Sequence, residues 1–151
     1  MRYIALTIAL WMPLTALAES SEKSWEAKCS TNEMTDKYSC TVTYTHHFTK
    51  DDELTYIIIS AAEDAVFVRQ KDLYPHRDVQ IRIDKHKYHE SKHYIEGTVI
   101  FPHNKKIIEE MKTGESMKIR YDEWPRGLPN TLDVTLKGFA KAYNEAYVKG
   151  E

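Results

Sequence analysis

Apolar and polar residues alternate along several short segments of this chain. An alternation with a period of two makes one side of a segment apolar, which is typical of a β-strand that buries one face. The alternating apolar positions are Trp25, Ala27 and Cys29; Cys40, Val42 and Tyr44; Val79, Ile81 and Ile83; Met117, Ile119 and Tyr121; and Leu132, Val134 and Leu136. The pattern therefore predicts a mostly β protein.

Two denser apolar runs, Leu54–Ile59 and Ala65–Val68, are rich in β-branched and aromatic residues. Such runs favour central strands that are covered on both faces. Tyr94–Phe101 is predicted to form one further strand. Gly97 inside this strand indicates a bulge or the close approach of another backbone segment.

A short helix is predicted over Lys105–Thr113. Pro102, His103 and Asn104 precede it as a helix start, and Gly114 follows it where a left-handed C-terminal cap is expected.

A second helix is predicted at the end of the chain, where apolar residues recur at helical spacing. They are Phe139, Ala142, Tyr143, Ala146 and Tyr147. Their stripe must pack against the sheet. The expected architecture is a β-sandwich-like single domain with a short helix and a C-terminal helix packed on the sheet.

The first eighteen residues have the composition of a secretory signal peptide. Arg2 precedes an apolar run, Ile4–Leu17, and Ala-Leu-Ala at positions 16–18 forms a cleavage site. The run is too short for a comfortable permanent membrane crossing. We expect residues 19–151 to form a single β-rich domain in the periplasm or outside the cell, with no stable membrane span after cleavage.

Cys29 and Cys40 are the two cysteines of the sequence. An even number of cysteines in an oxidising compartment predicts one disulfide bond. Both lie at alternating apolar positions of their predicted strands, so both sulfur atoms are expected to face the interior.

The net charge of the chain argues against a nucleic-acid partner, and we predict none. The chain has 21 basic and 23 acidic residues, and without Arg2 the remaining 20 basic residues give a net charge of −3 with neutral histidines. A nucleic-acid-binding domain has a basic excess instead. Protonation of all seven histidines would change −3 to +4, so the surface charge depends on pH.

One segment has the composition of a metal site, with His86, His89 and His93 close to Asp84 and Glu90. A Zn²⁺ ion needs three or four such ligands that converge. The predicted order of strand, polar connection and strand does not by itself bring them together. Binding of Zn²⁺, Cu²⁺ or Ni²⁺ and a solvated, lysine-rich hairpin tip are the two alternatives.

The loop Trp124–Pro129 combines an aromatic residue, Arg126 and two prolines. A rigid loop of this composition loses little entropy on binding, and Trp and Arg dominate many interfaces. Trp124 and Arg126 are therefore candidate partner-binding residues. The alternative is a structural turn in which Trp124 folds back onto the core.

Catalytic motifs are missing from the sequence: it has no Gly-x-Ser-x-Gly, no His-Glu-x-x-His and no glycine-rich phosphate loop. We therefore predict no catalytic residues and no cofactor. Acidic pairs such as Glu109 and Glu110 are expected to be solvated surface.

Several short motifs follow one another in a recognisable order along the chain. They are Trp25-x-x-x-Cys29, Cys40-Thr-Val, Lys112-Thr-Gly114 before a strand, and Leu136-Lys-Gly-Phe-Ala-Lys-Ala142 at the last helix. This order resembles the invasion-associated locus B family of exported bacterial proteins. The resemblance implies a periplasmic or secreted β-sandwich domain without established enzymatic activity. It also implies a link, in some members, to host-cell invasion.

These observations predict an exported, non-catalytic binding or interaction protein that acts in the bacterial envelope or on a host. Its expected partner is a protein or another envelope or host component. A histidine-mediated metal-binding periplasmic protein and a hydrolase-type enzyme are the alternatives.

Overall fold

The computed structural model describes residues 24–50 and 53–147, so the predicted signal peptide, residues 1–18, lies outside the described residues. In the described part of the chain, antiparallel strands form a sheet of six and a sheet of four. The six-stranded sheet has the order β1 (Glu26–Thr31), β2 (Tyr38–Lys50), β3 (Glu53–Ala61), β4 (Val66–Gln70), β8 (Thr98–Phe101) and β7 (His93–Ile95). The four-stranded sheet has the order β10 (Leu128–Thr135), β9 (Ser116–Glu123), β5 (Val79–Ile83) and β6 (His89–Ser91).

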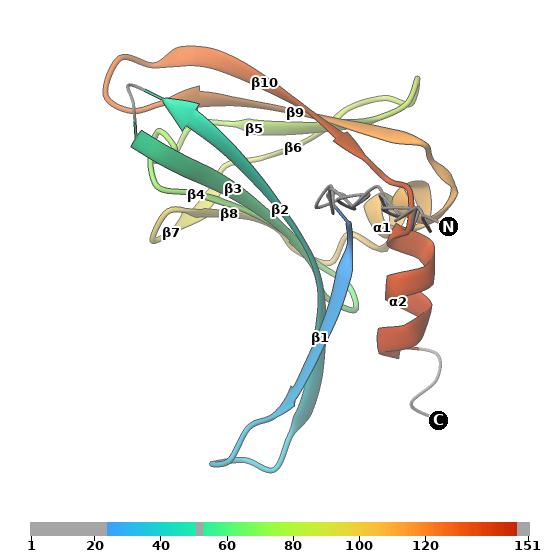
Figure 1. Ribbon diagram of the computed structural model, residues 1–151. Helices are drawn as coiled ribbons and strands as arrows, with labels where there is room; N and C mark the ends of the chain where they lie inside the picture. Colours follow the sequence, from blue (N-terminus) through green and yellow to red (C-terminus); the bar gives the residue numbers. More distant parts are fainter. Residues whose placement is uncertain (1–23, 51–52, 148–151) are drawn as a thin grey trace, which may run out of the picture.

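The two sheets face each other and share one apolar core, which confirms the sandwich-like prediction (Figure 1). The inward positions of the strands are the alternating residues of the sequence pattern. They include Val42, Tyr44, Val79, Ile81, Ile83, Met117, Ile119, Tyr121 and Val134, all of them buried. Each buried Val or Ile side chain stabilises the fold by about 1.5–3 kcal/mol.

The short helix α1 (Lys105–Thr113) begins as predicted, with the Asn104 side chain accepting a hydrogen bond from the Ile107 N–H at 3.2 Å. The predicted left-handed cap at Gly114 is wrong, because its φ is −82°. Glycine is needed there for space instead: an added Cβ would lie 2.5 Å from Cγ2 of Ile83. Gly114 thus lets the end of α1 approach β5.

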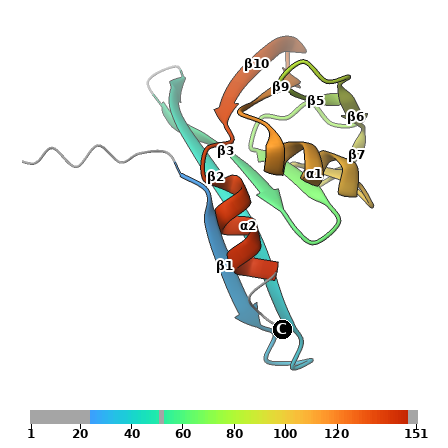
Figure 2. The same cartoon turned by 90° about the vertical axis from the view of Figure 1, so that its right-hand side faces the viewer.

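The C-terminal helix α2 (Phe139–Tyr147) packs on β1 and β2, as predicted (Figure 2). Phe139 is fully buried, and its ring contacts Trp25 edge to face at 4.9 Å between centroids. The Trp25 indole N–H donates to the Thr135 carbonyl at 2.8 Å, just before the helix. Neither helix of the described segments has the length and apolar character required to cross a bilayer.

The two dense apolar runs form the central strands β3 and β4, but the prediction that both faces are covered is wrong. Burial alternates along β3: Ile57 and Ile59 are inaccessible, whereas Leu54 is 69% exposed and Tyr56 is 44% exposed. The reason is that the second sheet covers one face only. Apolar side chains therefore remain on the surface at the start of β3.

The predicted strand Tyr94–Phe101 is a hairpin, β7 and β8, rather than one strand. Glu96 and Gly97 both have positive φ, 45° and 78°, as a two-residue hairpin turn requires. The predicted close backbone approach at Gly97 is present, because its carbonyl accepts the Gln70 backbone N–H at 3.2 Å.

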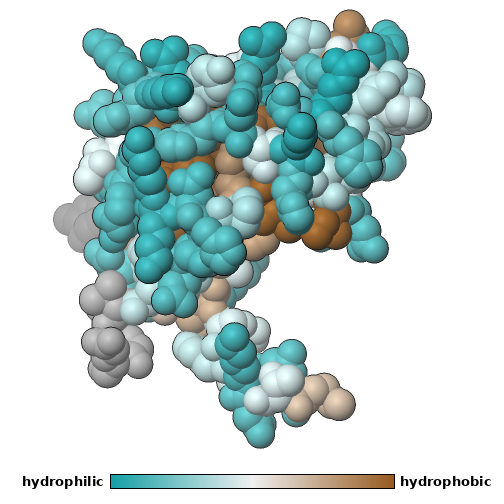
Figure 3. Space-filling view, turned by 180° about the vertical axis from the view of Figure 1, so that it is seen from behind, coloured by the Kyte–Doolittle hydropathy of each residue, from teal (hydrophilic) through white to brown (hydrophobic). Residues whose placement is uncertain are grey.

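The predicted disulfide bond joins Cys29 to Cys40, which lie opposite each other in the β1–β2 register. The prediction that both sulfurs face the interior is wrong: Cys40 is buried, but Cys29 and all of β1 are exposed. β1 is an edge strand, and its hairpin with β2 forms an arm that extends past the rest of the sandwich (Figure 1). The space-filling view shows the same arm standing away from the body (Figure 3).

Candidate ligand-binding site

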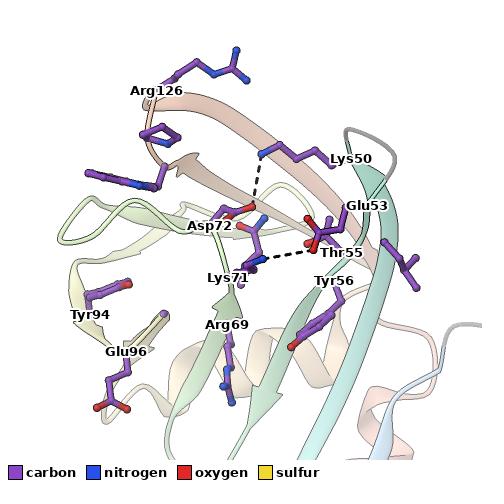
Figure 4. Close-up of a pocket in the computed structure, with 15 residues that line it drawn as sticks. Lys50, Glu53, Thr55, Tyr56, Arg69, Lys71, Asp72, Tyr94, Glu96 and Arg126 are labelled. Carbon is purple, nitrogen blue, oxygen red and sulfur yellow. Dashed lines mark ion pairs between the residues drawn. The ribbon is translucent and has the colours of Figure 1, made fainter.

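A pocket of about 700 Å³ opens at one end of the sandwich, beside the loop that joins β9 to β10. Strand ends and turns form its wall (Figure 4). The lining comprises residues 53–56, 69–72 and 124–126, together with Lys50, Tyr94, Glu96 and Gly97. Segments from both sheets therefore contribute to a single cavity.

The chain passes from one sheet to the other along this wall. After Gln70, the last residue of β4, it reaches the four-stranded sheet at Leu73, which forms an isolated bridge with Glu123. The Trp124 N–H then donates to the Asp72 carbonyl at 2.8 Å. These backbone contacts hold the β9–β10 loop against the end of β4.

Gln70 is the unusual residue of the wall. It continues the inward-facing row of Val66 and Val68 on β4, and it is fully buried. Among residues 24–50 and 53–147, no group hydrogen-bonds its side-chain Nε2 or Oε1. Each buried polar atom left unpaired costs about 1–3 kcal/mol, so most such atoms in proteins have a partner. The side chain is therefore costly to the fold, and neither of its polar atoms is exposed to solvent.

Charged residues of opposite sign pair with each other beside Gln70. The Lys50 Nζ lies 2.5 Å from a Glu123 carboxylate oxygen and 3.9 Å from one of Asp72. The Lys71 Nζ lies 3.6 Å from a Glu53 oxygen. Figure 4 shows Lys50 directed to Asp72 and Lys71 directed to Glu53. The Lys50–Glu123 pair is mostly buried, whereas Lys71 and Glu53 are 74% and 75% exposed and pair on the surface. Arg69 and Arg126 also line the pocket.

Tyr121 on β9 is buried and is affected by the charges of this cluster. Burial, followed by the negative charges of Glu123 and Asp72, raises the pKa of Tyr121 to about 12. The phenol therefore stays neutral across the physiological range.

The predicted recognition loop forms part of the pocket rim. Trp124 is 53% exposed and Arg126 is exposed, so the alternative in which Trp124 folds into the core is wrong. The Trp124 ring packs edge to face on Tyr74 at 5.2 Å, and the Arg77 guanidinium lies 4.8 Å from the centre of the Tyr74 ring. This stack supports the indole while leaving half of it accessible. Partner binding by Trp124 and Arg126 stays a prediction.

Sequence reasoning did not single out Gln70, Tyr56 or Tyr94. A signal for Gln70 was present, because Val66-x-Val68-x-Gln70 places an amide at an inward position of an alternating strand. No comparable signal identifies the two tyrosines, which reach the pocket only after the sandwich has formed.

The structure does not bring together the three histidines of the predicted metal site. His86 lies in the turn after β5, His89 lies on β6 in the four-stranded sheet, and His93 lies on β7 in the six-stranded sheet. The chain thus changes sheets between the last two. His89 instead pairs with Glu110 of α1, at 2.7 Å between Nε2 and Oε2. Within the described ranges, no three His, Cys, Asp or Glu side chains are arranged to hold a metal ion.

Comparison with known proteins supports the fold. No protein-family model and no curated protein sequence matches the chain. A solved structure, the invasion associated protein B from Bartonella henselae, is similar with a TM-score of 0.59 and 18% sequence identity. The match covers 84% of this chain and 94% of that one. The protein therefore shares the fold of this invasion associated protein over nearly its whole domain.

Proposed function

We propose that this protein is an exported, non-catalytic binding protein and that its ligand occupies the pocket at the end of the sandwich. The observation that supports this proposal most directly is the pocket itself, which separate strand ends and loops line and whose rim includes the exposed Trp124 ring. A concave site with aromatic rings and a few polar groups is the usual form of a binding site.

The pocket rim supports the same function. Trp124 and Arg126 are residue types that dominate interface energies, and both are exposed where the pocket opens. The Trp124 ring is supported by Tyr74, so ligand binding costs little additional ordering of that side chain. A protein of similar fold is described as invasion associated, which supports the proposal of a host-directed role.

Capture experiments with a double variant test the proposal. The wild type and Trp124→Ala/Arg126→Ala are used as baits with envelope and host extracts. Both side chains are exposed, so the variant should fold and should lose the partners that the wild type captures. Lys87→Ala/Tyr88→Ala removes a cation and an aromatic ring from an exposed turn outside the pocket and serves as the matched control. A folded pocket variant that retains every captured partner would contradict the proposal.

A further inference from the structure

We propose that the pocket binds an extended, acidic peptide segment of a partner protein, which adds a strand to an open edge of β3. This inference rests on the proposed function and names the class of its ligand. β3 pairs with β2 from Glu53 to Ala61, whereas its pairing with β4 begins only at Ile57. Residues 53–56 of β3 therefore have no neighbouring strand on the β4 side, and the same residues line the pocket.

The edge is open because β4 ends early and the chain leaves the sheet there. Gln70 is the last residue of β4, and Leu73 already pairs with Glu123 of the other sheet. The Gln70 backbone N–H donates to the Gly97 carbonyl at 3.2 Å, on the β8 side and away from β3. In the described part of the chain, no segment continues the ladder beside residues 53–56.

The alternation of the backbone shows which groups face this edge. In an antiparallel ladder, each residue directs its N–H and C=O to the same neighbouring strand, and successive residues alternate. The Ala62 N–H donates to the Ala65 carbonyl at 2.8 Å in the β3–β4 turn, so the even-numbered residues of β3 face the β4 side. Leu54 and Tyr56 therefore present N–H and C=O groups that have no partner among the described residues. A second extended backbone carries acceptors and donors at the matching spacing.

The side chains beside the edge indicate where the peptide is apolar. Leu54 is 69% exposed and Tyr56 is 44% exposed, and both lie on the outer face of β3. Peptide residues opposite them would cover this apolar surface as cross-strand neighbours. Apolar side chains are thus favoured at two alternate positions of the peptide.

The charges of the lining favour a peptide that also carries carboxylates. Arg69 and Arg126 form no ion pair with any described residue, and Glu96 is the one lining carboxylate that is likewise unpaired. Arg69 lies on β4 next to the open edge, on the strand beside Tyr56 (Figure 4). A peptide carboxylate can also replace the exposed ion pair of Lys71, since such surface pairs are weak.

Peptide titrations of ¹⁵N-labelled protein, followed by NMR, test the inference. The probe is the pentapeptide acetyl-Glu-Val-Thr-Val-Glu-amide, whose two valines occupy alternate positions. We expect it to shift the backbone amide signals of Leu54 and Tyr56. A matched peptide with lysine in place of both glutamates should bind about threefold or more weakly, because it meets Arg69 with a like charge.

Two N-methylated forms of the probe separate strand pairing from side-chain contact. One is methylated on both valine nitrogens, and the other on the nitrogens of threonine and the last glutamate. The two forms therefore lose N–H groups from opposite edges of the strand, of which only one can pair with β3. One form should bind about tenfold or more weakly, while the other should bind like the unmethylated probe. The weakened form identifies the direction of the added strand.

Variants of the protein test the same contacts from its side. Leu54→Pro removes an N–H that faces the open edge and makes no ladder hydrogen bond, so the fold should tolerate it. It should weaken probe binding by about tenfold or more. Should this variant fail to fold, the two N-methylated probes decide the question with the wild-type protein. Arg69→Ala should remove the preference for glutamate over lysine, whereas Arg82→Ala, at an exposed strand position outside the pocket, should retain it.

Three results would overturn the inference. Equal binding of the two N-methylated forms would exclude strand pairing. Unchanged signals of Leu54 and Tyr56 would exclude this edge as the site. Dimerisation of the peptide-free protein that Leu54→Pro abolishes would assign the edge to a second copy of the chain. The proposed function has a separate outcome, since it fails only when the Trp124→Ala/Arg126→Ala bait captures what the wild type captures.

Discussion

Asp84 shows how a single exposed side chain joins two strands of the fold. Its carboxylate accepts the backbone N–H groups of Ser116, at 2.9 Å, and Glu115, at 3.1 Å, where β9 begins. These hydrogen bonds, that of Ser116 first, hold the pKa of Asp84 below its ordinary value. The segment that carries the histidines is thus anchored to β9 by a carboxylate, which is a structural role.

The lowered pKa of Asp84 predicts a pH-dependent stability. A carboxyl group with a lower pKa in the folded state stabilises the fold above its unfolded pKa of about 3.9, and this contribution disappears as the pH falls through the folded value. Asp84→Asn should therefore lower the Tm at pH 7, and the difference from the wild type should shrink below about pH 4. Melting curves from pH 7 to pH 2.5 measure this, with Glu33→Gln in the exposed hairpin turn as the control. A difference that is equally large at every pH would contradict it.

For a single residue, the sequence predicts whether the side chain is buried or exposed but not which groups it contacts. The inward position of Gln70 follows from the alternation of β4, and the exposure of Arg126 follows from its loop. The missing hydrogen bonds of Gln70 depend on which side chains the opposite sheet places near it. Those neighbours come from distant parts of the chain, so a local pattern contains no information about them.

The apolar pattern predicts a helix or strand correctly where that element buries one face against a single neighbouring layer. The stripe beginning at Phe139 predicts α2, and the alternating positions predict the buried faces of β5 and β9. The pattern fails for the β7–β8 hairpin, because the apolar residues continue through the turn at Glu96 and Gly97. It also fails for Cys29, because alternation does not reveal that the β1–β2 arm extends beyond the opposite sheet.

The burial of α2 predicts the effect of truncating its first side chain. Phe139→Ala removes a fully buried ring that contacts Trp25 and should lower the free energy of unfolding by about 3–5 kcal/mol. Lys141→Ala, at an exposed position of the same helix, should change it by less than about 0.5 kcal/mol. Denaturant unfolding of both variants provides the comparison. Equal stability of the two would show that α2 is not part of the core.

The disulfide bond stabilises the whole domain, and it forms only if the protein reaches an oxidising compartment. Cys29 and Cys40 are 11 positions apart, and a closed loop of this size stabilises a domain by about 3 kcal/mol in the chain-entropy account. We expect the exported protein to have an intact mass two hydrogens below that of the reduced chain. Cys29→Ser and Cys29→Ser/Cys40→Ser should lower the Tm by similar amounts. Free alkylation of both thiols in the native exported protein would contradict the pairing.

Export itself predicts a new N-terminus. Cleavage after position 18 should leave Glu19 as the first residue of the protein in envelope or secreted fractions. N-terminal sequencing of these fractions checks the position. Intact Met1 on protein confined to the cytoplasm would contradict export and remove the reason for an oxidised cysteine pair.

The pocket is a property of the whole molecule, and for this reason the sequence predicts only its rim. Lys50, Gln70, Gly97 and Trp124 lie on four separate segments that meet after both sheets have formed. The loop composition identifies Trp124 and Arg126 in advance, whereas the wall depends on strand order and on the crossing after β4. Composition alone also favours a metal site at His86, His89 and His93. The sheet topology places these three residues in a turn and in two different sheets.

Photo-cross-linking can show whether the ligand binds at this pocket. Trp124 is replaced by p-benzoylphenylalanine, and the protein is irradiated in its native compartment. The same replacement at Tyr88, an exposed aromatic residue outside the pocket, provides the control. If the ligand occupies the pocket, we expect a covalent adduct from position 124 and none from position 88. Adducts of the same identity and yield from both positions, or an adduct from position 88 alone, would contradict it.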